Sequence, residues 1–222
     1  MTQQRLSFTH FGVIVQHWPA LSRAFGIMLL AQVVMTSAST LDQFFAVRMG
    51  EGVLAGYSYA QRIMALVLGL TSVVVGRAML PVFSSVSDLR TSFVMAARWA
   101  WRFAGLGLLV ALVLSWIAEW VVMLLFQRGA FTENDTREVA KILRILALQL
   151  PFYLFAIVLV QWLGAAGKAA WLLLGAVAGF LAKLSGVLLW YDHGALALAA
   201  STALMYGVNA LTIYGTARRG MR

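Results

Sequence analysis

The chain has 222 residues, of which 62% are hydrophobic and only 11% are charged. A soluble domain of this size needs more polar surface, so the composition indicates an integral membrane protein. In such a chain the formal charge of +9 favours anionic lipid or an anionic substrate as partner, and not nucleic acid. The absence of cysteine excludes disulfides, thiol catalysis and cysteine-based metal sites.

Residues 1–23 are predicted to form an amphipathic segment at the membrane interface. Apolar side chains recur at near-helical spacing over residues 6–18, a stretch too short to cross a bilayer. Pro19 disfavours a helical conformation at Trp18 and is expected to end this short helix. Six transmembrane helices are then expected within 24–216, followed by a basic cytoplasmic tail, 217–222.

The first predicted span, 24–47, carries polar residues on one helical face. Gln32, Thr36, Ser39 and Gln43 share this face, and Asp42 flanks it. Two interpretations remain open. The face either hydrogen-bonds to neighbouring helices or lines a polar cavity.

The second predicted span, 57–80, has a stripe of small and polar residues: Ser58, Arg62, Ala65, Gly69, Ser72 and Gly76. Small residues let another helix approach or leave open volume, and an arginine can bind phosphate through its planar fork of donors. Alternatively, Arg62 reaches the membrane surface or pairs with Asp42 or Glu51. Pro81 is expected to help end the helix.

The third span is expected to follow a basic and aromatic membrane anchor at 88–102 and to end near Phe126. In the link after it, Thr132 and Asp135 have the spacing of a capping box. The fourth span is predicted to continue to about Gly164, with a kink at Pro151.

The last two predicted spans are 169–190 and 195–216. Lys183 lies well inside the first of them and needs a carboxylate, water or a long reach to the surface. Thr202, Tyr206 and Asn209 share one face of the second, which predicts either helix packing or a cavity wall.

The distribution of basic residues predicts that both termini are cytoplasmic. With that orientation the inner flanks carry the larger basic set: Arg5, Arg23, Arg90, Arg98, Arg102, Lys168, Arg218, Arg219 and Arg222. The sequence has no phosphate-binding Walker loop, no HExxH motif and no Ser/His/Asp constellation, so we do not expect an enzyme.

Two separated stretches resemble the MurJ/MviN family of lipid II flippases, part of the multidrug/oligosaccharidyl-lipid/polysaccharide exporter group. One runs from Leu41-Asp42 through Tyr59-Ala60-Gln61-Arg62 to Leu80-Pro81, and the other is the run 125–132, LFQRGAFT, with Asp135 shortly after it. The resemblance implies an all-α protein of the bacterial cytoplasmic membrane. Family members have two six-helix lobes around a central cavity, and this chain resembles the C-terminal lobe only.

The same resemblance implies roles for individual residues. Arg62 takes the position of a cavity arginine that holds the lipid-linked diphosphate, and Asp42 that of an aspartate associated with sodium in some members. Leu181 and Ser185 stand where further oxygen ligands would be expected, although Ser201 could contribute. Because Lys183 is near, its tethered ammonium could replace the free cation.

Together these observations predict transport of a lipid-linked, undecaprenyl-diphosphate glycan by alternating access. A homodimer or a separately encoded N-terminal lobe would complete the cavity. Na+ and H+ are the candidate coupling ions, and no other cofactor is expected. The alternatives are a flippase for exopolysaccharide or O-antigen precursors, a drug or cation antiporter, and a scaffold of a glycan synthesis complex.

The candidate site residues fall into two groups. The substrate-binding set is Arg62, Ser58, Gly69, Ser72, Gln32, Thr36, Ser39 and Gln43, and the coupling set is Asp42, Lys183 and Ser201.

Overall fold

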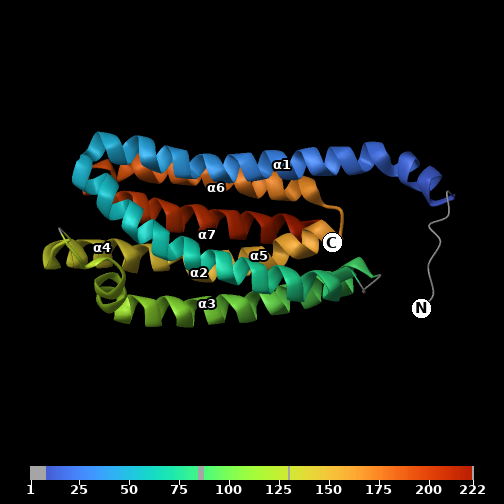
Figure 1. The fold of residues 1–222 in the computed structure, drawn as a ribbon. Coiled ribbons are helices and arrows are strands. Elements are labelled where there is room, and N and C mark those ends of the chain that lie inside the picture. The colour runs from blue at the N-terminus through green and yellow to red at the C-terminus, as the bar shows by residue number, and fades with distance from the viewer. Residues whose placement is uncertain (1–8, 85–87, 130, 222) are drawn as a thin grey trace.

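The fold is a bundle of long helices, seen in a computed structural model that describes residues 9–84, 88–129 and 131–221. The α-helices are α1 (Thr9–Met49), α2 (Glu51–Ser84), α3 (Leu89–Phe126), α4 (Glu133–Ala147), α5 (Gln149–Ala165), α6 (Ala169–Leu189) and α7 (Ala195–Arg219). One short 3-10 turn, η1 (Tyr191–His193), joins α6 to α7. The expected all-α architecture is confirmed (Figure 1).

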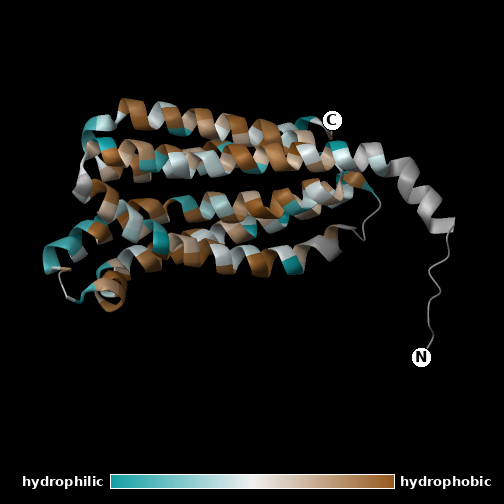
Figure 2. Ribbon diagram, turned by 45° about the horizontal axis from the view of Figure 1, so that its top comes forward, coloured by the Kyte–Doolittle hydropathy of each residue, from teal (hydrophilic) through white to brown (hydrophobic). Residues whose placement is uncertain are grey.

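Six helical stretches in the described residues are long and apolar enough to cross a membrane, with α4 and α5 together forming one of them. Successive spans run in opposite directions, so α1 begins and α7 ends at the same end of the bundle (Figure 1). Apolar residues run along most of the helices (Figure 2). Many large apolar side chains are exposed, including Leu112 and Trp116 on α3. An outward apolar surface is what a bundle in lipid requires.

Two predicted helix ends at prolines are wrong. Helix α1 continues through Pro19 and α2 continues through Pro81 to Ser84. A proline removes one backbone hydrogen bond and crowds the preceding turn, which bends a helix but need not end it when the flanking turns are stable. Figure 1 shows α1 bending near its start, and the membrane-long apolar part of this helix is Ser22–Met49. Residues 1–8 of the predicted interfacial segment lie outside the described part.

The remaining boundaries follow the local sequence closely. Gly50, with φ of +123°, is the whole link between α1 and α2. The predicted capping box is confirmed, since the Thr132 side chain accepts from the Asp135 amide and the Asp135 carboxylate accepts from the Thr132 amide. The predicted tail begins later than expected, because α7 extends to Arg219.

The predicted kink at Pro151 is a break between two helices. Proline has no N–H to donate to the carbonyl four residues earlier, and α4 ends at that residue, Ala147. Pro151 also packs against α3. A Cβ on Gly107 of α3 would lie 2.8 Å from the Pro151 Cα atom and from the Leu150 carbonyl oxygen, so only glycine permits this approach.

Candidate functional site

A buried ion pair joins α1 to α6. The Lys183 ammonium nitrogen lies 2.8 Å from Asp42 Oδ1 and 2.9 Å from Asp42 Oδ2. Lys183 is 1% exposed and Asp42 is 3% exposed, so both charges are removed from solvent. Lys183, whose charge lies well inside a predicted span, therefore has a carboxylate partner 141 residues away in the chain.

Three further side chains extend this pair into a network that includes α2 and α7. Lys183 donates a hydrogen bond to Thr202 Oγ1 at 2.5 Å, and the Tyr57 hydroxyl donates to Asp42 Oδ2 at 2.7 Å. The Gln61 amide donates to the same tyrosine oxygen at 2.7 Å. The first two helices of the chain, α1 and α2, thus meet the last two, α6 and α7, at one set of polar contacts.

The two oxygens of the Asp42 carboxylate differ in their contacts. Asp42 Oδ1 makes the 2.8 Å ionic contact with Lys183 but accepts no hydrogen bond of suitable geometry among the described residues. Two opposite charges at this distance in a low-dielectric interior compensate each other, whereas either one alone would be costly. The ion pair thus joins α1 to α6 within the bundle.

Ser201 is not part of the network. It is fully buried, its hydroxyl donates to the Leu198 carbonyl of its own helix at 2.9 Å, and its Cβ faces Gly186 of α6. The next residue, Thr202, points about 100° further around α7 and reaches Lys183 instead. Leu181 is exposed and Ser185 donates to its own helix, so neither approaches Asp42.

The sequence did not single out Tyr57 as a partner of Asp42, nor Gln61 as a partner of Tyr57. The available signal was their spacing, since Tyr57 and Gln61 lie one helical turn apart on α2. Thr202 was recognised as polar on its helix face, but its partner could not be named from that face alone.

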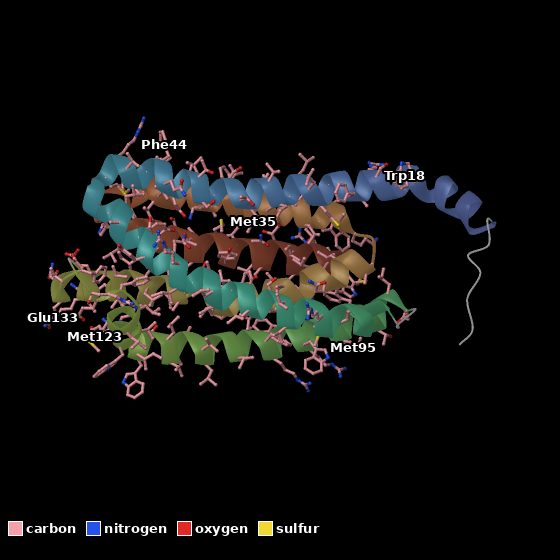
Figure 3. The ribbon with its side chains drawn as sticks, viewed as in Figure 1. Trp18, Met35, Phe44, Met95, Met123 and Glu133 are labelled. Carbon is pink, nitrogen blue, oxygen red and sulfur yellow. The ribbon has the colours of Figure 1, made fainter. Side chains whose placement is uncertain are left out.

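A groove of about 730 Å³ lies between α1 and α2, with α5, α6 and α7 forming the rest of its wall. Gln32, Gly69 and Ser72, all predicted substrate-binding residues, line this groove, together with Tyr153, Gln161, Tyr206 and Asn209. Met35 points from α1 toward α7 (Figure 3), where the Asn209 amide donates to its sulfur at 3.3 Å. The groove combines polar groups with an apolar wall.

The other predicted residues of α1 lie outside that groove. Thr36, Ser39 and Gln43 are exposed along the helix, and Gln32 donates to Thr36 Oγ1 at 3.4 Å. Since these side chains make no described contact with another helix of this chain, packing within the lobe does not account for the polar face.

Arg62 is exposed on α2, outside the groove. Its guanidinium lies 5.6 Å from the centre of the Tyr59 ring. It forms no ion pair with a described carboxylate: Asp42 pairs with Lys183, and the side chain of Glu51 lies outside the described part. Ser58, one turn earlier, is partly buried and also lies outside the groove. Among the described residues, no carboxylate engages the guanidinium of Arg62.

Comparison with known proteins gives a consistent result. The family model described as lipid II flippase MurJ matches residues 4–222. A probable lipid II flippase MurJ of Bdellovibrio bacteriovorus is 32% identical over 55% of this chain and 24% of its own length. One of Rhizobium tropici is 33% identical over 46% of this chain and 20% of its own length.

Solved structures show the same fold. A lipid II flippase MurJ in an inward closed conformation matches with a TM-score of 0.76 and 19% identity, covering 92% of this chain and 44% of that one. A transporter of the MOP superfamily from Pyrococcus furiosus matches with a TM-score of 0.61 and 19% identity, covering 87% and 43%. The chain thus spans less than half the length of the relatives it matches.

Proposed function

Because the chain belongs to the lipid II flippase MurJ family, we propose that it forms one lobe of a transporter that moves a lipid-linked glycan precursor across the cytoplasmic membrane. The observation that carries this proposal is the polar, open face between α1 and α2. Its groove of about 730 Å³ is lined by residues of α1, α2, α5, α6 and α7 and opens to the outside of the bundle. Polar groups in spans normally face a bundle interior or a water-filled cavity, so a second lobe is needed to enclose this face.

A second copy of this chain or an N-terminal lobe of the kind found in the family could supply the second lobe. Transporters are commonly built from two structural repeats with the substrate between them. The exposed side chains of Thr36, Ser39 and Gln43 fit the wall of such a shared cavity. Rocking of the two lobes would give alternating access, and both chain ends would lie in the cytoplasm, where the basic residues gather.

Arg62 is the proposed contact for the diphosphate. A guanidinium presents its donors in a rigid fork that matches phosphate oxygens, and this one has no carboxylate partner among the described residues. The sugar would occupy the polar groove, while the lipid tail would remain in the bilayer. The favoured cargo is a lipid II-like, undecaprenyl-diphosphate glycan.

The test is translocation of lipid II by the complex purified from its native membrane and reconstituted in vesicles. We expect Arg62→Ala to lower the transport rate by at least about tenfold, the loss of one charged hydrogen-bonding group. Arg77→Ala, at the other end of the same helix, is the control and should transport normally. Full transport by Arg62→Ala at normal expression would overturn the role of this residue.

The mass and composition of that purified complex test the half-transporter proposal separately. A dimer, or a complex with a second multi-helix membrane subunit, supports it. A monomer, or a chain bound only to glycan synthesis enzymes, contradicts it and favours the scaffold.

For coupling, we propose that the Lys183 ammonium takes the place of a free cation beside Asp42. The support is the shell of oxygens around its nitrogen, which are both carboxylate oxygens of Asp42 and the hydroxyl of Thr202. Thermal stability and transport should then be the same in sodium chloride and in choline chloride, and Lys183→Met should abolish transport. A clear response of the wild type to sodium would contradict this proposal.

A further inference from the structure

The start of α3 carries a basic groove that the transport proposal does not use. The groove has a volume of about 570 Å³ and is lined by Arg90, Thr91, Val94, Met95, Arg98, Trp99 and Arg102. It lies at the end of the bundle where α1 begins and α7 ends, and Figure 3 labels Met95 there. We refer to this surface as the basic groove.

The three arginines of the basic groove are arranged on one helical face. Residues 90, 94, 98 and 102 are spaced four apart, so their side chains lie above one another along α3. Arg90, Arg98 and Arg102 are exposed, and none forms an ion pair with a described carboxylate. The Arg102 guanidinium lies 5.0 Å from the centre of the Trp99 ring, which fixes one wall.

One acidic residue lies near these arginines, and it is already engaged. Asp88 caps α3 by accepting a hydrogen bond from the Thr91 amide at 2.8 Å. Hydrogen bonds from Thr91 hold the pKa of the Asp88 carboxyl below its usual range, so this group is ionised at neutral pH. Three guanidinium groups against one capped carboxylate leave the basic groove with an excess of positive charge.

The tryptophans of α3 place this groove relative to the bilayer. Trp101 is 62% exposed and Trp120 is 70% exposed, and their separation of 19 positions corresponds to about 28 Å of helix. That length matches the hydrocarbon core of about 30 Å, and tryptophan favours the two interfaces. Arg98 and Arg102 therefore lie at the level of the lipid headgroups.

The same face of α3 becomes apolar directly beyond the arginines. Leu109, Leu112 and Trp116 continue the spacing toward Trp120, and all are more than half exposed. A molecule with an anionic head and two apolar chains would match both parts of this face at once, whereas a soluble anion or a polar protein segment would match only the first.

We propose that the basic groove binds the phosphate of an anionic phospholipid, whose acyl chains lie along the apolar face of α3. Arg98 and Arg102 hold the phosphate oxygens, and Arg90 with Thr91 contacts the outer part of the headgroup. The occupant is a lipid of the surrounding leaflet, and this proposal stands whether or not the transport proposal is right.

The test measures binding of phosphatidylglycerol and phosphatidylcholine to the delipidated, purified chain by native mass spectrometry. The variant Arg90→Gln/Arg98→Gln/Arg102→Gln should bind phosphatidylglycerol about 100-fold more weakly, at about 1 kcal/mol for each basic residue. The control Arg48→Gln/Arg128→Gln/Lys141→Gln removes the same charge from exposed positions at the other end of the bundle and should bind normally.

A second variant separates a defined site from diffuse attraction. Arg98→Lys/Arg102→Lys keeps the charge but loses the planar fork of donors, and we expect about tenfold weaker binding. Equal losses in the α3 variant and the control, or a wild type that binds both lipids alike, would overturn the proposal. So would displacement of the lipid by inorganic phosphate at comparable affinity, or loss of a co-purifying protein without any change in lipid binding.

Discussion

Two contacts in this bundle join helices by opposite means. Where α1 meets α6, the contact is a buried ion pair with hydroxyl partners, in which Lys183 lies 2.8 Å from Asp42 Oδ1. Where α3 meets α5, glycine lets two backbones come together, with Gly107 against Pro151. Since lipid is as apolar as the side chains, helix association in membranes relies on close packing and polar contacts of these two kinds.

The two contacts should differ in how easily they open when the helices move. Hydrogen bonds and ion pairs can exchange partners, and Asp42 Oδ1 accepts no hydrogen bond from the residues that the structure describes. Backbone packing has no alternative arrangement of similar energy, because the interior is close-packed. We therefore expect conformational change of the bundle to open the α1–α6 contact before the α3–α5 contact.

The largest effect should come from breaking the ion pair. Lys183→Met leaves the Asp42 carboxylate buried without a cation, and this should lower the free energy of unfolding by about 3–5 kcal/mol. Thermal unfolding in detergent measures the change. The double variant Asp42→Asn/Lys183→Met removes both charges and should recover most of the loss, whereas additive losses would show that the two residues do not act as a pair.

The packing contact is tested by two glycines of the same helix. Gly107→Ala places a Cβ 2.8 Å from backbone atoms of α5 and should destabilise the protein by about 1–3 kcal/mol. Gly105→Ala has open space around its Cβ and should be neutral or stabilising by about 0.5–1 kcal/mol. Equal melting temperatures of the two variants would contradict the close approach of α3 and α5.

A smaller effect is expected from a polar contact that accompanies this packing. The Trp162 indole donates to Ser92 Oγ at 3.0 Å, and both side chains are buried. Ser92→Ala leaves that N–H without an acceptor and should cost about 1–2 kcal/mol. Ser37→Ala, which removes an exposed hydroxyl bonded to its own helix, is the control and should melt like the wild type.

The smallest effect should come from an exposed ion pair at the far end of α3. Arg144 lies 2.8 Å from Glu119, with side chains 39% and 50% exposed. Glu119→Gln should change the free energy of unfolding by less than about 1 kcal/mol, and salt should reduce the difference further. An effect as large as that of Lys183→Met would contradict the expectation that the buried ion pair contributes more to stability than the exposed one.

Much of the fold could be predicted because lipid restricts the choices. Every backbone group in a span must bond within its own helix, so long apolar runs mark the helices directly. The runs at 169–190 and 195–216 correspond to α6, Ala169–Leu189, and α7, Ala195–Arg219. The ends at Pro19 and Pro81 were predicted wrongly because a local preference of proline yields to the stability of the turns on either side.

The candidate site could be predicted only in part. The sequence predicted that Lys183 needs a compensating partner, and it also predicted the polar face of α1. The sequence could not predict that Thr202, and not its neighbour Ser201, contacts Lys183, because this depends on how α7 is rotated against α6. The position of Arg62 could not be predicted either. Its guanidinium lies near the Tyr59 ring, outside the groove that Gln32 and Ser72 line.

By itself, the sequence determined that this is a membrane protein of six spans with a polar face and a buried lysine, because hydrophobicity and charge act residue by residue along a helix. The tertiary structure alone decided which helices meet, which carboxylate compensates the lysine and which polar side chains share a groove. These depend on the rotation and depth of each helix against the others, which packing sets for the whole bundle at once.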